Sequence, residues 1–127
     1  MENTMTHIHV WIGTFIGSKE DFNQYLEVDK VRVKLDVGGS QFDRDIGLNW
    51  YDEDHIGVYY SAINLSLKAA VDEIIGASGM LEDIYNLCLS KGINEANTML
   101  YYFNDDLEVV TSDRLSNGLV YIGVFEV

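Results

Sequence analysis

The residue types most able to do chemistry in this 127-residue chain stand side by side in the middle of the sequence. An aromatic pair, Trp50 and Tyr51, is followed by three acids, Asp52, Glu53 and Asp54. Calcium loops take ligands from alternate positions, with a glycine at the sharp turn and a distal glutamate, and this stretch lacks that pattern. Paired carboxylates for glycoside hydrolysis need a defined separation, which sequence does not reveal. Aromatic anchors beside charges that steer a partner are typical of protein interfaces. The stretch therefore has two interpretations, a binding surface or a solvated turn.

The histidines and the cysteine are weaker candidates. His7 and His9 fall on one face of a predicted strand, where they could hold a metal if His55 or a carboxylate converged on them. Solvated histidines at the start of a strand are the commoner origin of such a pair, so we assign no metal site. Cys88 shares a helical stripe with apolar residues, which predicts a buried, unreactive thiol. Because no Walker loop, nucleophile elbow, dinucleotide fingerprint or zinc-ligand spacing is found, we assign no catalytic residue and no cofactor.

The charge of the chain is strongly negative, with 8 Lys and Arg against 21 Asp and Glu and a net charge of −13. Such a field repels phosphate backbones and anionic lipid surfaces, so direct binding to nucleic acid or membrane is not expected. The imbalance lies after residue 34, where 16 acids face 4 basic residues. If the acids serve only solubility, they can lie anywhere on the surface. If they recognise a basic partner, they must lie together on one face.

Cysteine content and hydropathy predict the compartment. One cysteine excludes an intrachain disulfide, and the sequence starts without the basic segment and apolar run of a secretory signal. The apolar runs are far shorter than the ~20 residues that span a bilayer. We therefore expect a cytoplasmic protein without a membrane segment.

The elements that must position these residues are short. Alternating or β-branched runs predict strands at residues 7–15, 31–37, 56–60, 96–103, 107–111 and 119–127. Helical spacing predicts helices at residues 19–27, 40–47, 64–76 and 79–91. Ser18 and Ser40 each precede an aspartate by three positions, which is the spacing of a helix-capping residue.

The order of these elements predicts a single α+β domain over residues 1–127. Its sheet is expected to be mostly antiparallel or mixed, and to contain the strands at 7–15 and 31–37 together with a meander of the last three strands. The helices of residues 64–91 are expected to pack against it. In the first strand, Ile8, Val10 and Ile12 fall on one face and Trp11 on the other, where a tryptophan usually joins the core.

Four stretches make the chain recognisable: residues 9–15, 40–54, 101–104 and 121–125. The first is His-Val-Trp-Ile-Gly-Thr-Phe before a serine-initiated helix, and the second joins a Ser-x-Phe step to an aspartate-containing helical turn, a tyrosine and acids. Together they resemble the bacterial immunity protein 22 family over most of the chain. Two segments depart from the family pattern. Residues 31–37 are basic and hydrophobic where an acidic, turn-rich stretch is expected, and residues 61–96 carry no family motif.

The resemblance implies an immunity protein of a bacterial polymorphic toxin system, which binds and neutralises a cognate toxin without catalysing a reaction. Many antibacterial toxins are nucleases with basic clefts that hold phosphates, so an acidic inhibitor would associate with them rapidly. The partner is therefore expected to be a protein toxin with a basic surface. The residues predicted to contact it are Asp43, Asp45, Trp50, Tyr51, Asp52, Glu53 and Asp54.

The sequence leaves alternatives open for this stretch and for the whole chain. Phe42, Ile46 and Trp50 could pin residues 40–54 to the core while the acids cap backbone amides. The chain could be a small hydrolase that uses Asp, Glu and His, or an acidic adaptor whose partner is unrelated to toxins. Self-association and the activity of the toxin are left open too.

Overall fold

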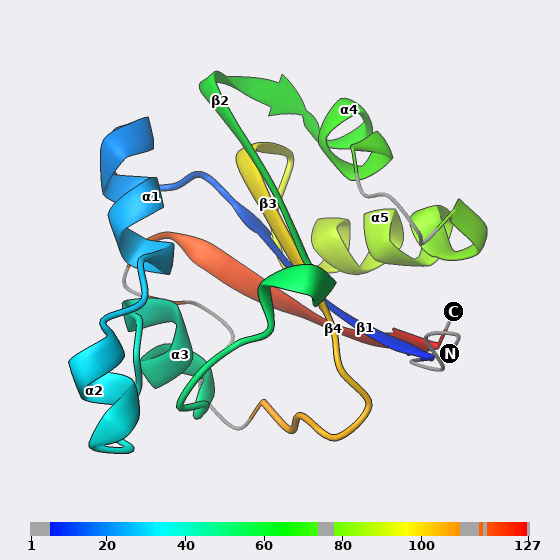
Figure 1. Cartoon of the computed structure of the whole chain (residues 1–127). Coiled ribbons are helices and arrows are strands. Elements are labelled where there is room, and N and C mark those ends of the chain that lie inside the picture. Colours follow the sequence, from blue (N-terminus) through cyan, green and yellow to red (C-terminus); the bar gives the residue numbers. More distant parts are fainter. Residues whose placement is uncertain (1–5, 74–77, 110–114, 116, 127) are drawn as a thin grey trace.

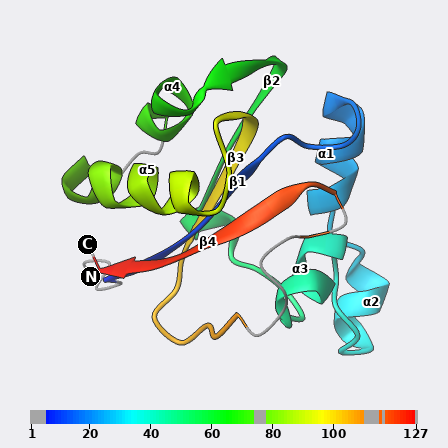
Figure 2. The same cartoon turned by 180° about the vertical axis from the view of Figure 1, so that it is seen from behind.

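The first strand, β1 (His7–Gly13), lies inside an antiparallel sheet (Figure 1). In the computed structural model, which describes residues 6–73, 78–109, 115 and 117–126, this sheet has four strands in the order β2-β3-β1-β4. The other strands are β2 (Ile56–Ser66), β3 (Glu95–Phe103) and β4 (Leu119–Glu126). Figure 2 shows β4 alongside β1. All three strand pairs are antiparallel, and the predicted α+β class is confirmed.

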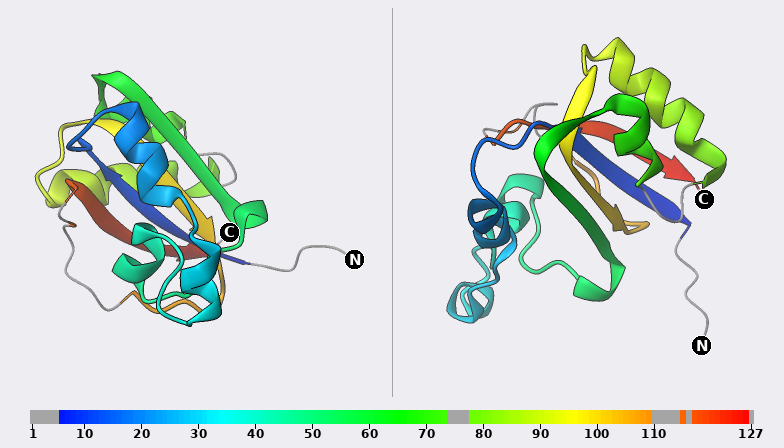
Figure 3. Two further views of the ribbon diagram at one scale, coloured as in Figure 1. Left: turned by 60° about the vertical axis from the view of Figure 1, so that its left-hand side comes forward. Right: turned by 90° about the horizontal axis from the view of Figure 1, so that it is seen from above.

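Helices lie on both sides of the sheet (Figure 3). One side carries α1 (Lys19–Leu26), α2 (Lys30–Lys34) and α3 (Gln41–Ile46). The other carries α4 (Leu67–Asp72) and α5 (Leu81–Ser90). The short 3-10 helices η1 (Glu53–His55) and η2 (Ser78–Met80) precede β2 and α5. The helices expected to pack on the sheet from residues 64–91 therefore form one of two helical layers.

The side chains of β1 divide the core into two clusters, because successive residues of a strand point to opposite faces. Ile8, Val10 and Ile12 pack with the buried residues of α4 and α5. Trp11 packs on the opposite face with Phe42 and the other buried aromatics of α1 and α3. The predicted alternation of this strand, including the burial of Trp11, is confirmed.

Two predicted helix caps are present. Ser18 Oγ accepts a hydrogen bond from the backbone N–H of Asp21 at 3.2 Å, and the Asp21 carboxylate accepts one from Ser18 N–H at 2.8 Å. Ser40 and Asp43 make the same reciprocal pair at 2.9 and 3.1 Å. Each pair satisfies N–H groups that have no partner within the helix, so it helps to set where α1 and α3 begin.

The predicted strand at residues 31–37 is wrong, because this segment starts with helix α2. The Asp29 carboxylate accepts hydrogen bonds from the N–H groups of Val31 and Arg32 at 2.9 and 3.4 Å and so caps the helix. Val31 and Leu35 are 65% and 66% exposed, so the alternation does not mark a sheet face. An N-cap contributes roughly 1 kcal/mol to helix stability, which is about the difference between the best and the worst strand-forming residues. Here the hydrogen bonds of the cap outweigh the preference of valine for strands.

The predicted C-terminal meander is also wrong, because β1 lies between β3 and β4 and β2 occupies the place beside β3. After β3, the Asn104 side chain accepts hydrogen bonds from the N–H groups of Asp106 and Leu107, both at 2.8 Å, and curls the chain away from a hairpin. Of the strand predicted at 107–111, residues 107–109 form no strand and 110–111 lie outside the described residues. The helix predicted at 64–76 is shorter than expected: residues 64–66 end β2, and α4 runs from Leu67 to Asp72 with Glu73 as its C-cap. Residues 74–76 of the prediction lie outside the described residues.

Cys88 lies in the cluster beneath α4 and α5 and is fully buried. Burial raises the pKa of its thiol to about 12, which leaves almost no reactive thiolate at neutral pH. We predict that a thiol reagent labels the native protein roughly a hundredfold more slowly than the denatured protein, because the thiol must first be exposed by an opening reaction. Rapid labelling at neutral pH without denaturant would contradict this prediction and make Cys88 a candidate nucleophile again.

Candidate functional site

The connection from α3 to β2 carries the acidic stretch. Gly47 ends α3 in the left-handed conformation, with φ at 81°. Asn49 then fastens the connection to the segment around α2, since its Nδ2 donates to the carbonyl of Val33 at 2.9 Å and its Oδ1 accepts from Gly38 N–H at 3.0 Å. The chain that follows Asn49 is therefore held in place before it reaches the aromatic pair.

Tyr51 anchors the connection in the core. Its hydroxyl donates to the carbonyl of Leu26 at 2.6 Å, and its ring packs edge to face on Phe42 and Tyr102, with centroids 5.6 and 6.5 Å apart. Burial raises the pKa of Tyr51 to about 12, so the hydroxyl remains a neutral donor. The N–H of Asp52 donates to the hydroxyl of Tyr102 at 2.9 Å, and the backbone is thus held after Tyr51 as well.

Trp50 faces the opposite way and is 57% exposed. It lines an open groove of about 670 Å³ between this connection and the α1–α2 segment. The groove is formed by Leu26, Glu27, Val28, Lys30, Val33, Lys34, Trp50 and Glu53. Because Asn49 and Tyr51 are both fixed, the exposed indole is presented by an ordered backbone. A large aromatic side chain held in this way is a typical binding anchor.

The three consecutive acids follow Tyr51 in the chain, and Glu53 lines the groove together with Trp50. Asp52 caps η1 by accepting from Asp54 N–H at 2.9 Å, and its second oxygen lies 2.8 Å from His55 Nδ1. Glu53 and Asp54 are exposed. An Asp–His pair can orient a general base, which would suit the hydrolase alternative. Within the described residues, however, no hydroxyl or thiol group is in hydrogen-bonding contact with His55.

The two acids of α3 have structural partners. Asp43 is buried, and its carboxylate accepts from the backbone N–H and the hydroxyl of Ser40 at 3.1 and 2.9 Å. Burial raises the pKa of Asp43, against an opposite effect of these hydrogen bonds. Asp45 is half-buried and accepts from the Tyr25 hydroxyl at 2.8 Å and from Gln41 Nε2 at 2.9 Å.

The structure divides the predicted contact residues by location. Trp50, Glu53 and Asp54 are exposed, Asp45 and Asp52 are intermediate, and Asp43 and Tyr51 are buried. Their contact with a toxin stays a prediction. The alternative of a pinned loop describes part of this stretch: the core holds Phe42 and Ile46, and two of the acids cap backbone amides. The third pin is Tyr51 rather than the exposed Trp50.

Sequence reasoning missed the contribution of α2 to this surface. Lys30, Val33 and Lys34 line the groove, at positions three and four apart on one side of the helix. Reading residues 31–37 as a strand concealed this spacing. The signal that could have revealed it is Asp29, an acceptable N-cap residue placed directly before the first lysine.

The three histidines have separate partners. His7 Nδ1 lies 3.2 Å from the carboxylate of Asp105. His9 is buried, with Nδ1 2.9 Å from the Tyr121 hydroxyl and Nε2 3.1 Å from the carbonyl of Asn104, and burial lowers its pKa. The carbonyl can only accept, so Nε2 carries the proton in the neutral ring. Among the described residues no group of three His, Cys, Asp or Glu side chains is arranged to hold a metal ion.

Comparison with known protein families identifies the family of this chain. A family profile described as Immunity protein 22 matches residues 8–127. The chain belongs to this family. Membership points to a toxin-neutralising role and to an inhibitor rather than an enzyme. Comparisons with curated proteins and with solved structures gave no match. In the part of the chain that the structure describes, no helix combines the length and apolar character needed to cross a membrane.

Proposed function

We propose that this protein neutralises a cognate bacterial toxin by binding a basic surface of that toxin through the acidic loop, defined here as Trp50, Asp52, Glu53 and Asp54. The observation that carries the proposal is the exposure of Trp50 between two fixed neighbours, Asn49 and Tyr51. Family membership supplies the kind of partner. In this proposal Asp43 and Tyr51 position the loop, and Asp45 adds negative charge beside it.

Occlusion of the toxin is sufficient for neutralisation, so the inhibitor needs no chemistry of its own. A net charge of −13 accelerates encounter with a basic surface of the toxin. The carboxylates of the acidic loop then pair with the positive charges of that surface. A nuclease fits this partner best, because its cleft must attract phosphates. In this proposal the protein acts in the cytoplasm of the bacterium that makes the toxin, as part of a polymorphic toxin system.

The proposal is tested by expressing the toxin encoded beside this protein, with and without the protein, in a susceptible bacterium. We expect cells to survive only when both are present, and the two proteins to co-purify. Killing that proceeds equally in both cases would defeat the proposal and favour the adaptor or hydrolase alternative. A variant with Phe42→Ala provides a control for loss of folded protein.

We predict that neutralising the acidic loop with Asp52→Asn, Glu53→Gln and Asp54→Asn slows association with the toxin by about tenfold at low salt. The difference from wild type should shrink as the Debye length falls from about 30 Å at 0.01 M salt to about 8 Å at 0.15 M. Stopped-flow association at several salt concentrations measures both effects.

The matched control removes three exposed charges from the opposite side of the sheet, with Asp72→Asn, Glu73→Gln and Glu82→Gln. The change in net charge is the same, so long-range steering falls equally in both variants. A larger effect of the loop variant therefore measures the position of the charges. Equal association rates for the two variants would remove the acidic loop from the interface.

A further inference from the structure

We infer that the groove beside Trp50 receives an apolar segment of the toxin that is flanked by an acidic residue, so that the interface has two parts of opposite charge. This inference rests on the proposed function and extends it. The acidic loop would contact basic residues of the toxin, while Lys30 and Lys34 on α2 would contact the acidic one.

The groove has the composition of a pocket for an apolar side chain. Its walls include Leu26, Val28, Val33 and Trp50. Lys30, Lys34, Glu27 and Glu53 add charged groups of both signs to the same lining. An apolar side chain inserted between Trp50 and Val33 would remove the indole from water, which is how aromatic anchors stabilise interfaces.

The charge at α2 is unusual for this chain. Three of its eight Lys and Arg residues lie in the five residues of α2, in a protein of net charge −13. Arg32 is used internally, since its Nε and Nη2 donate to the carbonyls of Gly38 and Val37 at 3.0 and 3.2 Å. For Lys30 and Lys34, no ion pair is formed with any acid in the described ranges. These two ammonium groups are therefore available to a partner.

The surface around α2 is also apolar. Val31 is exposed on the helix and Leu35 at its C-cap, and Val37 is 48% exposed just beyond it. The segment is held rigidly by the Asp29 cap and by the bond from Asn49 to Val33. An exposed apolar patch on ordered backbone marks an interaction site, and little conformational entropy is lost when it binds.

Charge complementarity selects the partner. A uniformly basic toxin surface would place like charges against Lys30 and Lys34, which costs free energy. A second copy of this chain would bring another net charge of −13, and general repulsion would oppose its approach. A toxin segment with an acidic residue beside an apolar one satisfies both the lysines and the groove. It also sets the orientation of the toxin, because the lysines belong to α2 and the acids Asp52, Glu53 and Asp54 to the loop after Trp50.

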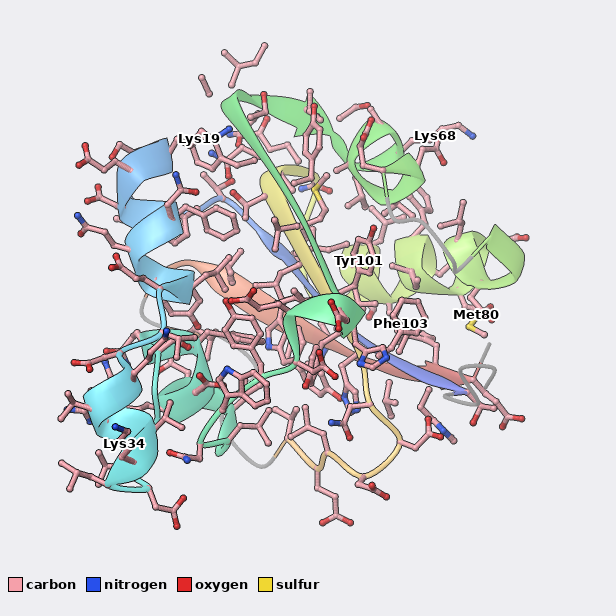
Figure 4. The ribbon with its side chains drawn as sticks, in the orientation of Figure 1. Lys19, Lys34, Lys68, Met80, Tyr101 and Phe103 are labelled. Atoms are coloured by element: carbon pink, nitrogen blue, oxygen red, sulfur yellow. The ribbon has the colours of Figure 1, made fainter. Side chains whose placement is uncertain are left out.

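The first experiment compares two charge-reversal variants for binding to the toxin identified by the survival test. The groove variant is Lys30→Glu with Lys34→Glu, and the control is Lys19→Glu with Lys68→Glu. Figure 4 shows Lys34 on α2 and Lys68 on α4 at opposite ends of the molecule. Each variant makes the protein more negative by four charges. If the toxin read only net charge, both variants would bind a basic surface at least as well as wild type. We expect the groove variant to bind about tenfold or more weakly and the control to bind no more weakly than wild type.

The second experiment observes the groove directly. The chain has two tryptophans, of which Trp11 is fully buried and Trp50 exposed. Labelling this protein with 5-fluorotryptophan gives one ¹⁹F signal for each, assigned with Trp50→Phe, and unlabelled toxin adds none. We expect addition of the toxin to shift the Trp50 signal and to leave the Trp11 signal in place.

The outcomes separate this inference from the proposed function. Neutralised toxin with equal affinities for the two charge-reversal variants would overturn the groove inference alone. An unmoved Trp50 signal in the complex would overturn the groove inference and also remove Trp50 from the interface of the proposed function. Absence of any complex with the wild-type protein would defeat both. A Trp50 signal that shifts with the protein's own concentration, without toxin, would assign the groove to a second copy of the chain and overturn the inference as well.

Discussion

Replacing Trp50 with alanine should weaken toxin binding by about 2 kcal/mol or more, which is roughly 30-fold in Kd. The indole is the exposed anchor of the acidic loop and one wall of the groove. Most of the loss should appear as faster dissociation, because the variant keeps the charges that guide encounter. Surface plasmon resonance with immobilised toxin measures both rate constants.

The same substitution should change the free energy of unfolding by no more than about 0.5 kcal/mol, because the side chain is mostly exposed. Comparing the loss of affinity with the change in the free energy of unfolding therefore separates a role in binding from a role in folding. Trp50→Phe keeps an aromatic ring and should recover part of the affinity. Unchanged dissociation of Trp50→Ala would exclude Trp50 as an anchor, and a large loss of stability would mean that it supports the loop instead.

Replacing Phe42 with alanine should lower the free energy of unfolding by about 3–5 kcal/mol. The ring is fully buried and lies against Trp11, Tyr25 and Tyr51, with centroids 5.4, 6.0 and 5.6 Å away. Its removal leaves a cavity at the meeting point of β1, α1 and the loop. Urea unfolding followed by far-ultraviolet circular dichroism measures the change.

Phe42→Leu is the matched control, since it keeps most of the apolar volume and should cost less than half as much. Because Tyr51 packs directly on Phe42, the alanine variant should also disorder the acidic loop and weaken toxin binding even where the protein remains folded. A loss below about 1 kcal/mol would show that the cluster repacks around the cavity, and would contradict the anchoring role of Phe42.

Which strands pair, and which aromatic side chain is buried, depended on contacts between distant residues. β1 became an inner strand because β3 and β4 both pair with it, through partners 85 to 119 residues away. The hydroxyl of Tyr51 finds the carbonyl of Leu26, 25 residues earlier, while its neighbour Trp50 is left at the surface. Two adjacent aromatic residues have the same local preference for burial, so only these distant partners could decide between them.

The sequence by itself determined the features that arise from short-range hydrogen bonds and from period-two hydrophobicity. Ser18 and Ser40 cap helices with acids three residues away, and β1 alternates between two core clusters. Residues 31–37 show the limit of prediction from local patterns. Val and Leu alternate there with the period of a strand, although the segment is not part of the sheet. The local cap by Asp29 favours the helix α2, whereas tertiary structure decided that the lysines of α2 would lie beside Trp50. The physical reason is that the groove is formed by α1, α2 and the acidic loop together, and no local pattern records that proximity.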